Sequence, residues 1–185
     1  MSWEIEIPPE VEAAWIERGG PIVKYPDPVL FKVAEPVGKP DKETRALVDR
    51  MKAAMKRDNG VGLAAPQLGE SLRIIVYQLP EEDSPFRAVL NPKIISRKGE
   101  QIGPEGCLSL PYLQGDVKRA MEVIVKGMDL LGRPFKRRAS GFEARIIQHE
   151  VDHLDGILFV DRVEEDTLHW LIGEEQEEAG AETRE

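Results

Sequence analysis

The sequence is poor in the side chains that form cross-links or bind soft metals. It has one cysteine, Cys107, and three histidines among 185 residues. A single cysteine excludes an intramolecular disulfide, and because a free thiol persists under reducing conditions, a cytoplasmic protein is expected. No apolar run approaches the ~20 residues of a membrane-spanning helix. Residues 1–12 carry four glutamates and lack the apolar stretch of a signal peptide, so nothing indicates export or a membrane partner.

An excess of positive charge is also missing. The formal net charge is -9, and residues 174–185 hold six glutamates against Arg184, which leaves the rest of the chain mildly acidic. This balance gives no indication of direct nucleic-acid binding. The densest basic run, Arg133 with residues 136–138, is interpreted as a solvated strand and turn. Residues 173–185 are predicted to be an acidic, disordered tail because they are too polar to bury a core.

The length suits one catalytic domain, which we place at residues 22–172 after an N-terminal extension of residues 1–21. The extension is predicted to contain a short helix at 9–18 that ends before Gly19 and Gly20. Asp41 is expected to cap a second helix that buries the apolar residues at 47, 48, 51 and 55.

The middle of the chain is predicted to be largely antiparallel β-structure. Strands are expected at 22–25, 72–78, 88–95, 121–128 and 135–139, separated by segments rich in Gly, Pro and Asp. A helix is predicted from about Gly141 to Asp155, begun by a capping box of Ser140 and Glu143, and residues 169–171 are predicted to form a short helix. The expected fold class is α+β, with antiparallel β-sheets packed around this central helix.

The central helix contains an H-E-x-x-H box made of His149, Glu150 and His153. At 100° per residue, His153 lies only about 40° around the helix from His149, so both imidazoles can reach one ion. Glu150 falls between them, where it can act as a base. Phe142, Ile146 and the two histidines continue one stripe, which places the site inside the domain.

Two imidazoles need a third protein ligand to complete a catalytic metal site, and the third ligand separates the classes of enzyme. The metzincin endopeptidases continue the box with a third histidine, but this chain has Phe159 at that position. His169 lies 16 residues beyond His153 and ranks low as a ligand. The remaining candidate is Cys107, and a Cys/His/His set suits Zn or Fe(II).

At this point the sequence resembles the peptide deformylases, whose three signature motifs are present in order. They read GVGLAAPQ at 60–67, EGCLSLP at 105–111 and QHEVDHLD at 148–155, and the similarity extends over about residues 22–162. The resemblance implies the deformylase fold. It also implies a metal-dependent hydrolase that removes the formyl group from the N-terminal formyl-methionine of newly synthesised proteins and releases formate.

The resemblance also implies the chemistry of the site. Ferrous iron would be the natural metal, with zinc, nickel or cobalt able to replace it, held by Cys107, His149 and His153. Such an ion lowers the pKa of water to about 7, and Glu150 would act first as general base and then as general acid. The side-chain amide of Gln67 and the backbone N–H of Leu108 would stabilise the oxyanion.

The formyl-methionine substrate implies an apolar pocket beside the metal, with glycines that let the substrate approach the backbone. Arg145 can line such a pocket only with its stem. Glu105 is expected to pair with Arg119 and support the cysteine loop. The residues expected to bind substrate are Gly60, Val61, Gly62, Phe142, Arg145 and Ile146.

Two other functions stay open from the residues alone. A zinc endopeptidase would use the same box but lacks its third histidine, and a closed structural metal site would need a fourth protein ligand that the sequence does not offer. The expected partners are nascent formyl-methionyl chains. Transient proximity to the ribosome fits that substrate, although the acidic tail argues against rigid docking on RNA.

Overall fold

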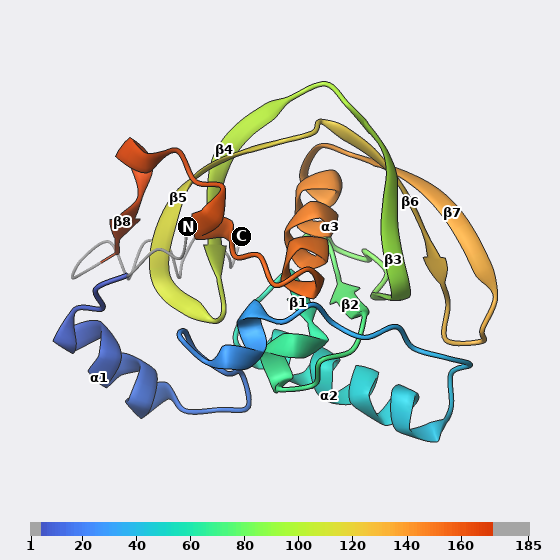
Figure 1. Cartoon of the computed structure of the whole chain (residues 1–185), viewed down its shortest axis with the longest axis horizontal. Coiled ribbons are helices and arrows are strands. Elements are labelled where there is room, and N and C mark those ends of the chain that lie inside the picture. Colours follow the sequence, from blue (N-terminus) through green and yellow to red (C-terminus); the bar gives the residue numbers. More distant parts are fainter. Residues whose placement is uncertain (1–4, 172–185) are drawn as a thin grey trace.

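One long helix, α3 (Gly141–Leu154), lies between two antiparallel β-sheets (Figure 1). The computed structural model describes residues 5–171, so the predicted tail at 173–185 lies outside the described residues. The larger sheet has the order β1-β2-β3-β6-β7 and the smaller one the order β4-β5-β8. The predicted α+β class, with antiparallel sheets around a central helix, is confirmed. The strands are β1 (Gly62–Ala64), β2 (Ile74–Tyr77), β3 (Arg87–Lys98), β4 (Gln101–Cys107), β5 (Leu110–Arg119), β6 (Glu122–Met128), β7 (Pro134–Ser140) and β8 (His169–Trp170).

Two further helices pack outside the sheets, α1 (Pro9–Arg18) and α2 (Lys42–Arg57). Both were predicted. Asp41 accepts a hydrogen bond from the Thr44 N–H at 2.8 Å, while its own N–H meets Thr44 Oγ1 at 3.4 Å, so α2 begins in a capping box. The four predicted inward residues of α2 are buried. Short 3-10 turns occur at η1 (Pro28–Phe31), η2 (Ala65–Leu68), η3 (Phe159–Asp161) and η4 (Glu165–Thr167).

The two sheets are continuous with each other at one end of α3. Gly99 and Glu100 join β3 to β4, and Ala120 and Met121 join β5 to β6, so the chain passes twice from one sheet to the other. Figure 1 shows both connections arching over the end of α3. The helix is therefore held inside a folded β-structure instead of lying on its surface.

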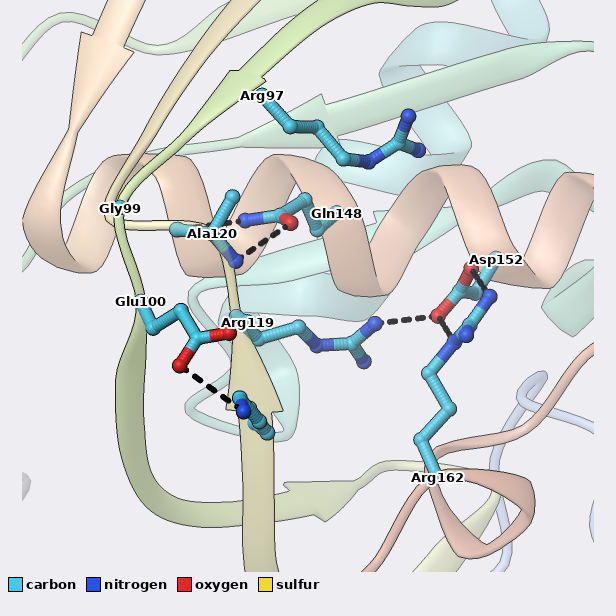
Figure 2. Close-up of a pocket in the computed structure, with 9 residues that line it drawn as sticks. Arg97, Gly99, Glu100, Arg119, Ala120, Gln148, Asp152 and Arg162 are labelled. Atoms are coloured by element: carbon cyan, nitrogen blue, oxygen red, sulfur yellow. Dashed lines mark hydrogen bonds and ion pairs between the residues drawn. The ribbon is translucent and has the colours of Figure 1, made fainter.

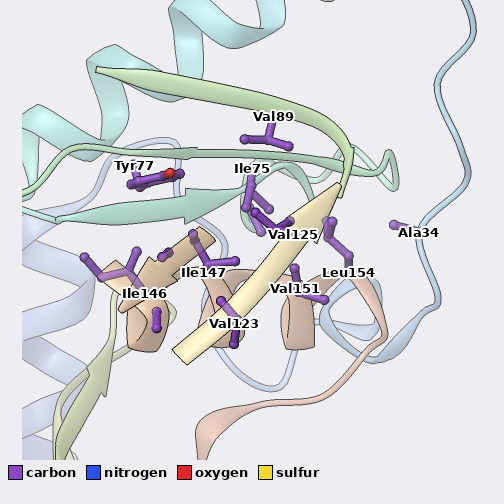
Figure 3. Packing of buried hydrophobic residues seen from close by; sticks show 13 residues of the cluster. Ala34, Ile75, Tyr77, Val89, Val123, Val125, Ile146, Ile147, Val151 and Leu154 are labelled. Carbon is purple, nitrogen blue, oxygen red and sulfur yellow. The ribbon is translucent and has the colours of Figure 1, made fainter. Parts of the chain in front are cut away.

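The apolar side of α3 packs against the larger sheet (Figure 3). Ile147 and Leu154 meet Ile75, Val123 and Val125, all of which are at most 1% exposed. Fully burying such a side chain contributes roughly 1.5–3 kcal/mol. This packing fixes the rotation of α3 about its own axis, and the rotation decides which way the box residues point.

The opposite face of the larger sheet carries aligned lysines. Lys93 of β3 pairs in register with Lys126 of β6, which pairs with Lys136 of β7, and all three are exposed. Arg138 lies on the same face one pair further along β7 and is also exposed. Like charges directly opposite each other cost some stability. The basic run at 133–138 was predicted to be a solvated strand and turn, and it forms the start of β7.

Three local predictions were wrong. Residues 22–25 form no strand: the Val23 N–H donates to the Gln67 carbonyl and the Tyr25 N–H to the Ser109 carbonyl, both at 2.9 Å, so the segment joins two loops. Residues 169–170 form β8, paired with Leu113 and Gln114 of β5. Ser140 makes no side-chain cap bond to α3, and the Glu143 side chain, the other half of the predicted capping box, binds Tyr77 and Arg137.

The division into an extension at 1–21 and a domain at 22–172 stays a prediction. Helix α1 packs on the smaller sheet side of the molecule, where Val11 and Trp15 join a core cluster with Leu113. No helix in the described part of the chain has the length and apolar character needed to span a bilayer.

Candidate active site

Helix α3 and the end of β4 bring Cys107, His149 and His153 together. Their ligand atoms all lie within 4.8 Å of one another, and Cys107 Sγ is 3.2 Å from His153 Nε2. The two imidazoles are 5.0 Å apart between ring centroids. One thiolate and two imidazoles in this arrangement fit a single Zn or Fe(II) ion with a position left open. The fold thus brings Cys107 to two histidines that lie 42 and 46 positions further along the chain.

The surroundings of Cys107 favour the thiolate form of its side chain. Burial raises its pKa, but the charges of His153 and His149 and the hydrogen bonds from both rings more than offset that effect, so the pKa lies well below its ordinary value. A thiolate is the form that binds metals. The Ser109 N–H, 3.4 Å from Cys107 Sγ, adds a donor to the same sulfur.

Glu150 is buried, at 4% exposure, beside the ligand cluster. Burial raises its pKa to about 7, ahead of the opposing charges of His149 and His153. Its Oε2 atom has no hydrogen-bond partner within residues 5–171. A buried, unpartnered carboxylate oxygen with a pKa near neutrality can accept and return a proton.

Gly62 stands directly against Glu150. A Cβ built on Gly62 would overlap Glu150 Oε1 and would come within 3.0 Å of Ile146 Cγ2. A larger residue at this position would therefore displace the Glu150 carboxylate. The backbone of β1 and the carboxylate of α3 form two walls of one narrow site.

Glu105 orients His149 from behind. Its carboxylate lies 2.9 Å from His149 Nδ1, so this nitrogen carries the proton and the other ring nitrogen is free to bind an ion. Both oxygens also accept from Arg119, and Arg145 Nη1 donates to Oε1 at 2.8 Å. Burial raises the Glu105 pKa, but the bonds to Arg119 and His149 outweigh it and the pKa is lowered. The predicted Glu105–Arg119 pair is present, and it extends to the histidine.

Arg145 was expected to bind substrate, but its charged group is bound inside the fold. Its stem lines the cavity, but its guanidinium is buried and donates to Glu105 and to the carbonyls of Gly103 and Val117, at 3.2 and 2.9 Å. The charge is thereby neutralised inside the fold. Sequence reasoning had no signal for this, because Glu105 is 40 residues away.

A second cluster supports the far side of α3 (Figure 2). Arg119 and Arg162 both bind the Asp152 carboxylate, and the Gln148 side chain donates to and accepts from the backbone of Ala120, each at 3.0 Å. These residues border a cavity of about 530 Å³. Asp152 was predicted to point away from the metal as a solvated or structural carboxylate. It is 7% exposed and pairs with Arg119 and Arg162, so its role is structural.

Gln67 and Leu108 lie on either side of the cysteine. The Gln67 amide nitrogen is 3.5 Å from Cys107 Sγ and 3.2 Å from Ser109 Oγ, while its oxygen accepts from the Ala64 N–H at 2.9 Å. Because the Gln67 oxygen is bound to the Ala64 N–H, the NH₂ end of the amide is the one that faces Cys107. Leu108 touches Gly60: a Cβ at Gly60 would lie 2.7 Å from Leu108 Cδ1.

A cavity of about 540 Å³ opens in front of this cluster. Its lining includes every residue predicted to bind substrate, with Phe142 half exposed at 48%. Sequence reasoning missed several other lining residues. Pro111 could have been found, since it ends the second motif, but nothing in the sequence indicated Arg18, Asp58 or Tyr112.

The alternative third ligands lie outside the cluster. Phe159, where metzincins have histidine, is 1% exposed and stacks on the His149 ring at 6.4 Å between centroids. His169 is exposed on β8 and its Nδ1 meets the Thr167 carbonyl at 2.8 Å. Within residues 5–171 the histidines and cysteine thus form one cluster, of Cys107 with the two box histidines.

Known proteins share this fold and sequence. Residues 20–168 match the family model for polypeptide deformylase. A peptide deformylase of Dictyoglomus thermophilum is 51% identical over 147 residues, which is 80% of this chain and 94% of that protein.

Two solved structures are similar as well. The peptide deformylase from Synechococcus elongatus, in complex with actinonin, has a TM-score of 0.75 at 42% identity and covers 77% of this chain and 79% of its own. The Met-Ala-Ser-bound peptide deformylase from Acinetobacter baumannii has a TM-score of 0.73 at 40% identity, covering 77% of this chain and 97% of its own. The chain belongs to the polypeptide deformylase family, the hydrolases that remove the N-formyl group from nascent peptides.

Proposed function

We propose that this chain hydrolyses the formyl amide of N-formyl-methionyl peptides with Glu150 as its proton carrier and Cys107, His149 and His153 as the ligands of one divalent metal. The observation that carries the proposal is the meeting of these three ligand side chains with a buried carboxylate whose Oε2 has no partner among residues 5–171. A closed structural site would not need such a carboxylate.

Ferrous iron is the proposed resident ion because membership of the deformylase family implies it; one thiolate and two imidazoles suit iron and zinc alike. When bound, the ion supplies a Lewis acid and makes water a nucleophile near neutral pH. Zinc, nickel or cobalt fit the same donors. A ferrous ion also agrees with the reducing cytoplasm in which a free thiol persists.

Glu150 moves the proton in this proposal. Its Oε2 accepts a proton from the attacking water, and the same carboxyl then gives it to the nitrogen of the departing methionine. A pKa of about 7 allows both steps at neutral pH. The water oxygen forms a bond to the formyl carbon and the C–N bond breaks, which gives formic acid and a free amino terminus. The formic acid keeps the second hydrogen of the water and loses it as a proton to become formate.

Gln67 and Leu108 are the proposed donors to the oxygen that gains negative charge. The Gln67 carbonyl is engaged by the Ala64 N–H, which leaves the amide NH₂ facing the cluster. Leu108 brings a backbone N–H from the residue next to Cys107. Pre-aimed donors of this kind are typically worth 10²–10³-fold in rate.

The substrate side chain is proposed to lie against Val61, Phe142 and Ile146, with Gly60 and Gly62 giving it access to the backbone. Arg145 contributes only its stem there, because its guanidinium is bound to Glu105. The Met-Ala-Ser bound to the Acinetobacter baumannii relative agrees with a methionyl peptide as ligand. Such chains are met where proteins are made, so proximity to the ribosome belongs to the proposal.

The test is formate release from formyl-Met-Ala-Ser by protein purified without oxygen and loaded with iron. We expect Glu150→Gln to retain its metal, by elemental analysis, and to lose about 10²–10⁴-fold in kcat. Glu43→Gln, at an exposed position in the first turn of α2, is the matched control and should keep full activity. Undiminished turnover by Glu150→Gln would overturn the proposed proton carrier.

A second measurement tests the ligand set. Cys107→Ala should lose most of its bound metal after dialysis, whereas Ser109→Ala, two residues away and buried, should keep it. Full occupancy in Cys107→Ala would reject the cysteine as a ligand. Cleavage of an unformylated internal peptide bond by the wild type would favour an endopeptidase instead.

A further inference from the structure

The N-terminal helix contributes a charged residue to the substrate cavity. Arg18, the last residue of α1, lines the cavity together with Asp58 and the residues of the first motif. The family match begins at residue 20, so Arg18 comes from a part of the chain outside the matched region.

Helix α1 is fixed in place beside the cavity. Val11 and Trp15 are buried, and the Trp15 indole N–H donates to the Pro111 carbonyl at 3.1 Å. The Trp15 ring also lies 6.2 Å from the Trp170 ring, between centroids. Pro111 itself lines the cavity, so α1 is bonded directly to the cavity wall.

Two arginines meet one carboxylate where α1 ends, and they form a cationic cluster. Arg18 Nε is 3.0 Å from Asp58 Oδ1, Arg57 Nη1 is 3.7 Å from the same oxygen, and the other Arg57 nitrogen donates to the Arg18 carbonyl at 2.6 Å. One carboxylate against two guanidinium groups leaves an excess of positive charge, which attracts an anion.

This cationic cluster lies one short segment away from the reacting group. At one end of the segment 58–62, Gly62 packs against Glu150, and in its middle Gly60 packs against Leu108. At the other end, Asp58 accepts a hydrogen bond from Arg18. Four residues of extended chain span at most about 13–14 Å. Because residues 58–59 form a turn and residue 61 a bend, the segment is shorter than this limit. An extended peptide with its formyl group at Glu150 therefore reaches Arg18 within its first four residues.

We propose that Arg18, supported by Arg57, forms an anion-binding subsite for a carboxylate of the substrate up to four residues after the formyl group. The inference rests on the proposed function and assigns a substrate preference to the same cavity. The carboxylate can be an acidic side chain or a peptide's own C-terminus, since both present the same two oxygens to a guanidinium.

Two pairs of peptides separate these sources. The first pair is formyl-Met-Ala-Ala-Asp-Ala-amide and its Asn counterpart, and the second is formyl-Met-Ala-Ala as free acid and as amide. We expect the wild type to favour the carboxylate member of at least one pair by about fivefold in kcat/KM, mostly through KM, as suits a partly exposed ion pair. The preference should fall as salt is raised.

The readout for the variants is the ratio of kcat/KM within a pair, which does not depend on the fraction of folded enzyme. Arg18→Gln should reduce the ratio to about 1, and Arg18→Lys should keep part of it. Arg50→Gln is the control, because Arg50 also pairs with a carboxylate, Glu70, but on the exposed face of α2. It should keep both the ratio and the rate.

The outcomes are distinguishable. Wild-type ratios of about 1 in both pairs, or a preference that Arg18→Gln retains, would overturn the subsite. If Arg18→Gln lowers kcat/KM equally for all four peptides, Arg18 has only a structural role, and the subsite is overturned as well. Absence of formate from every peptide, neutral ones included, would instead reject the proposed function.

Discussion

Arg119 binds Glu105 through both carboxylate oxygens, with Nε 2.9 Å from Oε1 and Nη2 2.8 Å from Oε2. Both side chains are 4% exposed. Because Arg119 also binds Asp152, this single guanidinium joins β4, β5 and the metal-box helix. The orientation of His149 depends on it through Glu105.

Removing this guanidinium should destabilise the protein strongly. Arg119→Met leaves the Glu105 and Asp152 charges buried with fewer partners, and we expect a loss of about 3–5 kcal/mol in the free energy of unfolding. Urea denaturation measures it. Arg138→Met, which breaks an exposed pair with Glu122, should cost less than about 1 kcal/mol. Equal losses would contradict the buried network as the cause.

Gly62→Ala should impair turnover more than folding. The added methyl group would overlap Glu150 Oε1, and displacing a reacting group by about 1 Å can cost on the order of 10²-fold. We expect kcat for formate release to fall by that amount while bound metal, by elemental analysis, stays the same. Gly38→Ala, whose new methyl group would meet nothing within 4 Å, serves as the control. Full activity in Gly62→Ala would argue against the close approach.

Trp15 should be a main anchor of α1. Trp15→Phe removes the hydrogen bond to the Pro111 carbonyl and part of the buried area, so we expect a loss of about 1–2 kcal/mol in unfolding free energy. The adjacent Ile16 is 76% exposed, and Ile16→Ala should change stability by less than about 0.5 kcal/mol. Thermal or urea unfolding compares the two. A Trp15→Phe variant as stable as the wild type would mean that α1 is held by other contacts.

Asp41 should make stability depend on acid pH. Bonds from the Thr44 N–H and hydroxyl lower its pKa below 3.8, so its contribution is present above that value and is lost as the pH falls through the folded pKa. Asp41→Asn keeps a capping side chain without the charge that favours a helix N-terminus. We expect its Tm to lie below that of the wild type at pH 7, with the difference shrinking towards pH 3. A difference that stays constant with pH would exclude the charge as its origin.

The helices and the metal ligands could be predicted because their signals are local or repeated. Helix α1 is bounded by Pro9 and the glycines after Arg18, α2 begins at Asp41, and the box histidines are fixed by helical spacing. Cys107 was found by elimination, since the chain has no other cysteine. Each of these inferences uses residues within one or two turns, or the whole composition.

Other features depend on contacts between distant residues. Strands β4 and β5 were missed because Gly103, Pro104 and Gly106 interrupt the apolar alternation, and their hydrogen bonds come from pairing with each other. Residues 22–25 have a strand-like composition, yet their backbone bonds go to two separate loops. In the capping box predicted at Ser140, the Glu143 half is absent because its carboxylate binds Arg137 and Tyr77 instead.

The site shows the same division. Sequence motifs predicted the ligands, Glu150 and most of the cavity wall. They did not predict that the Arg145 charge would be bound inside, or that Arg18 would reach the cavity, because both depend on how the elements pack. A charged side chain in a motif shows which residue is present but not which partner it finds.

The row of lysines across the larger sheet affects how copies of the chain meet. Strand β7 is an edge strand, and its free backbone groups could pair with a strand of another molecule. A strand added there would place its side chains beside Lys136 and Arg138, and a second copy of β7 would bring the same charges with it. The like charges cost one molecule a little stability, but they repel a second strand and so protect the exposed edge of the sheet from pairing with another copy.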